Sequence, residues 1–218
     1  TIQCIEKLIS SYEITLKFIL VGEENLETVH EPSLYNIYCL QDVNRIAPFY
    51  NIDFQAHEYP AKELVEKANS ILTAAKSDDL IEIANKVSSA LWEGDIGTLD
   101  KLSSTYFATK AEVKDNLIQG NKIRDARGYY FGSAFYYEKE LYWGVDRLPY
   151  LEERLAELGA KKAHEIQNIC PLKLEAPTKF TSDKKVNLYY YPSLNSPYTF
   201  VSTKRIRRMQ EDYPINLI

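Results

Sequence analysis

Several familiar site signatures are missing from this sequence. The three cysteines, Cys4, Cys39 and Cys170, form no C-x-x-C pair, so a dithiol oxidoreductase site of the usual kind is absent. Free buried thiols in a reducing compartment are the expected state of these side chains. The three histidines have no metal-ligand spacing, so we predict no metal site.

The sequence also has no long apolar run and no strong excess of one charge. No apolar run approaches the roughly 20 residues that a membrane span needs, so we expect no membrane association. The net charge is −5 and the basic run at residues 204–208 is short, so nucleic acid is not expected as a partner. The chain starts at Thr1 and its only methionine is Met209. A signal peptide would therefore not be visible, and we expect a cytoplasmic protein.

What the sequence does contain is typical of a soluble globular protein. Of its 218 residues, 45% are apolar and 26% are charged, a balance that suits one domain, or one and a fraction. Its 17 tyrosines cluster at residues 129–142 and 189–198. We interpret these aromatic clusters as strand and core packing.

The stretch at residues 127–158 predicts a β-hairpin followed by a helix. Residues 135–137 and 141–143 are rich in aromatic side chains and favour two strands, with a polar turn between them. Asp146 can then cap a helix. The apolar residues of this helix recur at helical spacing, as Leu148, Leu151, Leu155 and Leu158.

Upstream of the hairpin, the hydrophobic pattern predicts mostly helices. Residues 1–12 place apolar side chains on one helical face, and residues 14–21 alternate apolar and polar side chains as a strand does. A polar loop follows at residues 22–32. Further helices are predicted at residues 34–49, 61–76 and 79–92, from residue 96 for a short length, and at 110–125.

The C-terminal part predicts a strand, a helix and the start of another strand. A linker that contains prolines covers residues 171–184, and alternating side chains indicate a strand at 186–190. A turn at 193–197 leads into helical spacing at 199–213. Residues 215–218 start the next strand.

Four motifs carry a family resemblance: LYNIYCLQDVNRIAPFYNIDF, ALWEGDIG, FGSAFYYEKELYWGVDRLPYLEERL and SPYTFV. Together they resemble the 2-hydroxychromene-2-carboxylate isomerase family, which belongs with kappa-class glutathione transferases and DsbA-like oxidoreductases. In the third motif the matching residues are Phe131, Gly132, Trp143, Gly144, Asp146, Arg147, Leu148, Leu151 and Glu152. The resemblance implies an α/β, thioredoxin-like fold of the DsbA/kappa type, with an all-helical insertion between the two halves of the sheet domain.

On this resemblance, residues 1–33 and 126–168 form the thioredoxin-like domain and residues 34–125 form the helical insertion. A linker spans 169–184, and residues 185–218 begin a second thioredoxin-like repeat. The ending Y-P-I-N-L-I echoes Y-E-I-T-L-K near the start, which supports an internal repeat. Two alternatives stay open. In one, the last strand and helix are permuted and complete the first sheet; in the other, residues are missing from the chain.

The resemblance implies a catalytic role for Ser196 and binding roles for its neighbours Pro197 and Tyr198. The family's serine hydrogen-bonds the sulfur of glutathione at the start of a helix, where a hydroxyl donor and the helix N-terminus stabilise the thiolate. The alternative is that Ser196 simply caps the helix. Pro197 suits the first turn in either case, because its missing N–H costs nothing there.

The hairpin supplies the other residues that the resemblance assigns to glutathione binding. Asp146 and Arg147 match the residues that hold its γ-glutamyl end, with the carboxylate serving the ammonium group; alternatively, they are a helix cap and a surface side chain. Ser133 and Ala134 match the loop that pairs with the glutathione backbone. Ala134 stands where the family has a proline in cis, and a cis peptide bond before any other residue costs roughly 2.5–4 kcal/mol.

Two functions are carried forward from these motifs. The first hypothesis is a glutathione-dependent isomerase or transferase that acts on a small-molecule electrophile through thiolate addition. Glutathione would be its cofactor, and homodimers are usual in the resembled family. The second hypothesis is a non-catalytic thioredoxin-fold binding or scaffold unit with a degenerate site, which Ala134 favours. A dithiol oxidoreductase is the third and least favoured hypothesis, because the C-x-x-C motif that such an enzyme uses is missing.

Overall fold

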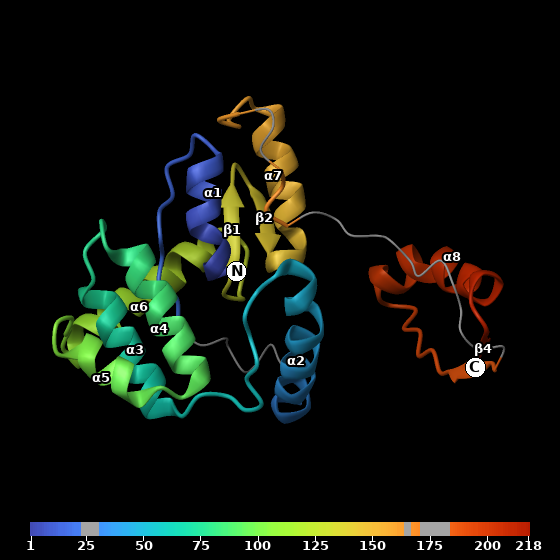
Figure 1. The fold of residues 1–218 in the computed structure, drawn as a ribbon, viewed down its shortest axis with the longest axis horizontal. Helices are drawn as coiled ribbons and strands as arrows, with labels where there is room; N and C mark the ends of the chain where they lie inside the picture. Colours follow the sequence, from blue (N-terminus) through green and yellow to red (C-terminus); the bar gives the residue numbers. More distant parts are fainter. Residues whose placement is uncertain (23–30, 164–166, 171–183) are drawn as a thin grey trace. The chain divides into compact units, whose positions relative to one another are not determined.

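The chain folds into two compact units, Thr1–Lys173 and Leu174–Ile218. The computed structural model describes residues 1–22, 31–163, 167–170 and 184–218 (Figure 1). Each unit combines helices with a two-stranded sheet, so the expected mixed α/β class is confirmed. Most of the predicted loop and linker falls outside the described residues. Within the described part, no helix has both the length and the apolar character that crossing a bilayer requires.

The first unit begins with the predicted helix. It consists of the 3-10 helix η1 (Ile2–Cys4) followed by α1 (Ile5–Ser11). Ile5 and Leu8 are buried, Leu8 with 1% of its surface exposed. The apolar face that the sequence predicted is therefore the face that enters the core.

The strand predicted at residues 14–21 is wrong, because this segment has no ladder partner in the part of the chain that is described. Its side chains alternate as far as Phe18: Ile14, Leu16 and Phe18 are half-buried, and residues 13, 15 and 17 are exposed. A bridge pairs Tyr12 with Lys161 just before the segment. An alternating pattern predicts a two-sided environment, but a strand also needs a neighbour, which no local pattern provides.

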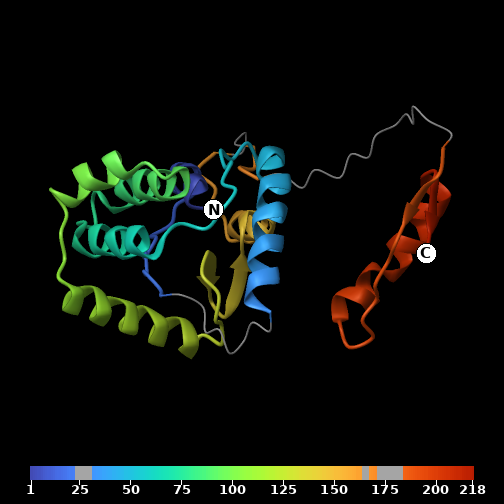
Figure 2. The same ribbon diagram turned by 90° about the horizontal axis from the view of Figure 1, so that it is seen from below.

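The helices from residue 32 onward match the predicted ones. α2 (Pro32–Ile46) and the 3-10 helix η3 (Ala47–Tyr50) come first. The next four, which lie together at one end of the first unit (Figure 2), are α3 (Lys62–Ala74), α4 (Leu80–Glu93), α5 (Ile96–Ser103) and α6 (Lys110–Ala126). Ile71, Val87 and Leu99 each come from a different helix and share one core.

Gly120 allows α6 to approach the extended segment at residues 19–22. A Cβ atom at this glycine would lie 1.9 Å from the carbonyl oxygen of Leu20, so no larger residue fits without movement. The N–H of Gly22 donates to Asn121 Oδ1 at 2.9 Å. Residues 19–22 are thus held by contact with the helix α6, whereas the sequence predicted that this segment is a strand of a sheet.

The predicted hairpin is confirmed as β1 (Ala134–Tyr137) and β2 (Glu140–Trp143), paired antiparallel. Its two turn residues, Glu138 and Lys139, have φ angles of 42° and 76°, the left-handed conformation of a two-residue type I′ turn. Phe135 and Tyr142 lie opposite each other and pack against the first unit's core. One face of the hairpin therefore packs against that core.

The helix predicted after the hairpin is confirmed as the 3-10 helix η4 (Val145–Arg147) and α7 (Leu148–Glu157). Its buried face lies in one cluster with Leu8 and Tyr12 of the N-terminal segment, and α1 and α7 flank the hairpin in Figure 1. Two details are wrong. Asp146 lies inside η4 and makes no capping hydrogen bond. Leu158 lies past the end of α7, beyond the last turn that faces the core, and is therefore 46% exposed.

The second unit is a strand, a helix and a strand in the predicted order. β3 (Val186–Leu188) and β4 (Ile215–Leu217) pair in parallel, joined through α8 (Pro197–Asp212). The helix starts two residues before the predicted start because the Ser-Pro pair forms its first turn. None of its described residues is buried, and large apolar side chains such as Phe200 and Val201 are 85% and 78% exposed.

Candidate functional site

The four hairpin residues that the resemblance assigns to glutathione lie together at the open end of the hairpin. Ser133 and Ala134 enter β1, while Asp146 and Arg147 follow β2. The hydrogen bond from Gly144 N–H to the Ser133 carbonyl, at 3.1 Å, ties the two stretches. Ser133 has a φ of 55°, and the described residues contain no cis peptide bond. The bond before Ala134 is therefore trans, unlike that of the family's proline.

The pairing pattern leaves the backbone of Ala134 facing the free edge of β1. Ala134 lies opposite Trp143, and the bond from Gly144 to Ser133 marks these two as a non-hydrogen-bonded pair of the ladder. The N–H and C=O of Ala134 consequently point away from β2. Among the described strands, β1 has no second neighbour. An extended peptide can pair with such an edge by strand addition.

Asp146 and Arg147, which follow β2, form an ion pair at the open end of the hairpin. Arg147 Nη1 donates to Asp146 Oδ2 at 2.6 Å, and the side chains of Arg147 and Asp146 are 49% and 44% exposed. Gly144, with a φ of 77°, leaves room for the carboxylate, since a Cβ there would lie 3.1 Å from Asp146 Oδ1. Burial raises the pKa of the Tyr50 hydroxyl, and the negative charge of Asp146 adds to this shift. The carboxylate is exposed enough to accept from an ammonium group of a ligand.

The second group of predicted site residues lies in the second unit, at the start of α8. Pro197 is the first helical residue, and Tyr198 is 75% exposed. Ser196 occupies the N-cap position, yet its hydroxyl makes no capping hydrogen bond. The backbone N–H of Ser196 donates to the Ser193 carbonyl at 3.0 Å, and its side chain is half-buried.

The structure thus brings the predicted residues together in two groups, one in each compact unit. Ser133, Ala134, Asp146 and Arg147 share the end of the hairpin, while Ser196, Pro197 and Tyr198 share the start of α8. Each group is complete in its own unit.

A buried polar cluster around Glu152 was not predicted as a site. Glu152 is 1% exposed, and its Oε1 accepts from the Tyr12 hydroxyl at 3.1 Å and from the Ile169 N–H at 2.8 Å. Its Oε2 accepts from the Cys170 N–H at 3.2 Å. The sequence signal was a glutamate at helical spacing from two buried leucines, Leu148 and Leu155.

Burial and charge around Glu152 shift the titration of its neighbour. Burial raises the pKa of the Tyr12 hydroxyl, and the adjacent Glu152 carboxylate raises it further. Tyr12 therefore stays protonated and donates its hydrogen bond throughout the neutral range. The cluster holds residues 169 and 170 against α7, which makes it a structural anchor for the end of the first unit.

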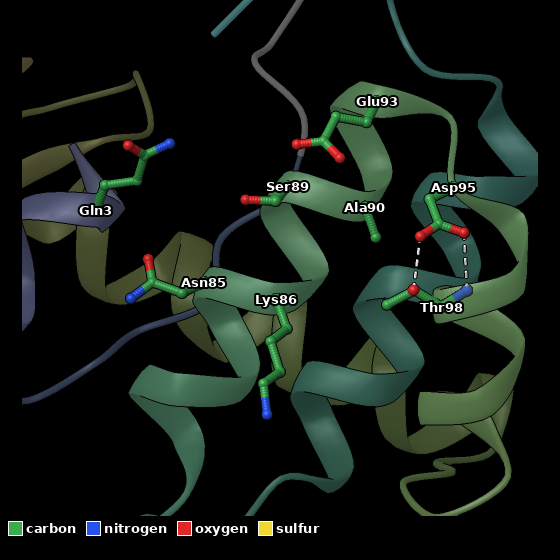
Figure 3. Close-up of a pocket in the computed structure, with 8 residues that line it drawn as sticks. All are labelled: Gln3, Asn85, Lys86, Ser89, Ala90, Glu93, Asp95 and Thr98. Atoms are coloured by element: carbon green, nitrogen blue, oxygen red, sulfur yellow. Dashed lines mark hydrogen bonds between the residues drawn. The ribbon is translucent and has the colours of Figure 1, made fainter. Parts of the chain in front are cut away.

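A surface depression of about 410 Å³ lies between η1, α4 and α5 (Figure 3). Its lining residues are Gln3, Asn85, Lys86, Ser89, Ala90, Glu93, Asp95 and Thr98. Two of its charged groups are already engaged within their own helices: Lys86 pairs with Glu82, and Asp95 caps α5 through Thr98. None of the predicted site residues lines this depression. The arrangement of its polar groups does not indicate a particular class of ligand.

The described residues contain no group of His, Cys, Asp and Glu side chains that could hold a metal ion. Comparison with known proteins finds no match to a family model, a curated protein or a solved structure. The site is therefore interpreted from its own geometry and from the motifs in the sequence.

Proposed function

We propose that this chain is a glutathione-dependent isomerase or transferase with a thioredoxin-like fold. The observation that carries the proposal is Ser196: its hydroxyl lies at the N-terminus of a 16-residue helix and is not used for capping. A free hydroxyl donor next to the positive end of a helix dipole stabilises a bound thiolate. The hairpin group supports the same ligand, because its free strand edge and exposed carboxylate suit a short peptide with an ammonium group.

The order of elements supports the thioredoxin-like part of the proposal. The first unit ends with an antiparallel hairpin and a helix, and the second unit is a parallel strand–helix–strand. In the proposed fold these elements correspond to the two halves of a thioredoxin-like domain, in the reverse order along this chain. In the proposed fold, residues 34–125 are a helical insertion, and residues 185–218 are either the start of a second repeat or a permuted first half.

In the proposed mechanism each residue has a separate task. In the first unit, the backbone N–H and C=O of Ala134 pair with an extended peptide, and Asp146 accepts from an ammonium group. In the second unit, Ser196 donates its hydroxyl hydrogen to a bound sulfur atom and so favours its deprotonated form. Glutathione supplies the thiolate that adds to the electrophile.

The first experiment is a calorimetric titration of the whole chain with reduced glutathione. We expect saturable binding that Ser196→Ala weakens roughly 10- to 100-fold, the effect of losing a hydrogen bond to a charged group. Ser196→Thr is the matched control, because it keeps the hydroxyl and should bind nearly as well as the parent chain. Equal binding by all three proteins would contradict the role of Ser196.

A second function is favoured by the trans peptide bond before Ala134. In this alternative the chain is a non-catalytic binding or scaffold unit that keeps the fold. The tyrosines that could fill its site divide between the two faces of the hairpin: Tyr142 packs on the core, while Tyr136 lies under the Arg127 guanidinium at 4.3 Å. Absence of glutathione binding to the folded chain would select this alternative.

A further inference from the structure

Two cysteines at opposite ends of the first unit meet in its core. Cys4 lies in η1 and Cys170 is the last described residue before the boundary between the units. Their sulfur atoms are 3.8 Å apart, and the residues are 4% and 0% exposed. The bond length of a disulfide is about 2.05 Å, so a small change in side-chain rotation would join them.

The surroundings hold Cys170 in this position. Glu152 accepts from the N–H of Cys170 and from that of Ile169, and its own position is fixed by Tyr12 and by the buried face of α7. Cys4 is held by the first turn of the N-terminal helix, which belongs to the same core cluster. The two sulfur atoms thus meet between two anchored backbones.

The two thiols are chemically unequal. The hydrogen bond from Cys170 lowers the pKa of the Cys4 thiol to about 7, against the opposing effect of burial. The same contact raises the pKa of the Cys170 thiol, and burial adds to that shift. Cys4 therefore forms a thiolate more readily than Cys170 and is the sulfur that attacks first. Cys39, which is half-buried in α2, has no part in this contact.

We propose that Cys4 and Cys170 are a redox pair that forms an intramolecular disulfide by exchange with a small-molecule disulfide. The Cys4 thiolate attacks the disulfide, forms a mixed disulfide and releases one thiol. Cys170 then attacks the Cys4 sulfur, loses its proton and releases the second thiol. Two protein thiols are oxidised and one small disulfide is reduced to two thiols, so electrons and protons balance.

Closure of this bond would join the N-terminal helix to the residue that ends the first unit. The resulting loop runs from residue 4 to residue 170 and encloses the helical bundle, the hairpin and α7. A cross-link across so long a loop restricts the unfolded chain strongly. The oxidised first unit should therefore resist unfolding at higher denaturant concentration than the reduced one. The chain leading to the second unit would start from a covalently fixed point.

The test uses the whole chain, equilibrated with oxidised glutathione and, separately, with hydroxyethyl disulfide. Free thiols are then blocked with an alkylating reagent and the protein is digested with trypsin without reduction. Before the free thiols are blocked, the oxidised intact protein should be about 2 Da lighter than the reduced protein. The expected linked peptides are TIQCIEK, residues 1–7, and AHEIQNICPLK, residues 163–173. The neutral second oxidant makes the result independent of whether the protein binds glutathione.

Two variants complete the design. Cys39→Ser should form the same linked peptides as the parent chain, and its unfolding midpoint should rise on oxidation. Cys170→Ser should form no internal bond and show no rise. Linked peptides that contain Cys39, or full alkylation of both Cys4 and Cys170 after either oxidant, would overturn the proposal.

Discussion

At the scale of single residues, the least expected feature is the carboxylate of Glu152 in the core. A buried acidic group is costly unless its oxygen atoms are hydrogen-bonded. Here one side chain and two backbone N–H groups donate to it. The cluster connects α7 to residue 12 on one side and to residues 169 and 170 on the other, so a single side chain links three separate parts of the sequence.

Removal of this carboxylate should destabilise the first unit. Glu152→Ala leaves three buried donors without their acceptor, and we expect a loss of about 3 kcal/mol in the free energy of unfolding. Glu152→Gln keeps the volume and one acceptor oxygen and should lose less. Tyr12→Phe removes one donor only, at a cost of about 1 kcal/mol. Urea denaturation of the three variants measures the series, and an equal effect of all three would contradict the network.

The Tyr12 hydroxyl predicts a loss of stability in alkali. Its pKa in the folded chain is raised above the ordinary value of 10.0. The folded state therefore keeps its proton where the unfolded state loses it, and stability is present below pH 10 and falls as pH rises further. Tyr142, whose pKa burial raises to about 12, acts in the same direction.

Unfolding measured between about pH 9 and pH 11 tests this expectation. The free energy of unfolding should fall over that interval, and the fall should be smaller in Tyr12→Phe. A Tyr12→Phe variant with the same pH dependence as the parent chain would show that the buried hydroxyl does not titrate as described.

At the scale of elements, the contact between α6 and the extended segment at 19–22 depends on Gly120. Gly120→Ala places a methyl group against the Leu20 backbone, and we expect a loss of about 1–3 kcal/mol from overpacking. The matched control is Gly97→Ala in α5, where the new Cβ would lie at an ordinary contact distance of 3.4 Å from Asp95 Oδ1.

The control should keep or raise stability, since alanine favours a helix by about 1 kcal/mol over glycine. Thermal unfolding of both variants provides the comparison. If Gly120→Ala were as stable as Gly97→Ala, the close approach of α6 to residue 20 would be wrong.

At the scale of the whole molecule, the two units differ in how much they bury. The first unit has two apolar cores, one around α1 and α7 and one within the helical bundle. The described residues of the second unit include no buried side chain, although they include many large apolar ones. A strand–helix–strand unit without a core gains little from folding alone.

Hydrogen exchange on the whole chain should reveal this difference. Backbone amides of α8 should exchange much faster than those of α4, which contributes four buried residues to the first unit. Protection of α8 equal to that of α4 would contradict the expectation and would show that another surface covers the apolar side chains of the second unit. Sedimentation analysis of the same sample would show whether that surface belongs to a second copy, which also tests the expected homodimer.

Features that depend on neighbours along the chain could be predicted from the sequence. Helical spacing predicted every helix of the described residues to within a few positions, and the aromatic runs with two polar residues between them predicted the hairpin. The spacing predicted the start of α8 two residues late, although a Ser-Pro pair is typical of the first turn of a helix. These features follow from periodicity and turn chemistry over short distances.

Features that join distant residues could not be predicted from local patterns and came from the fold. Residues 14–21 alternate like a strand, yet the partner that would make them one is not supplied by their own pattern. The contact between Cys4 and Cys170 crosses 166 positions, and the burial of Glu152 depends on residues 12, 169 and 170. The division of the predicted site residues between two compact units could not be predicted from local patterns either. Pairing, burial and proximity depend on which segments the fold brings together, and hydrophobic periodicity specifies only which face of each segment is apolar.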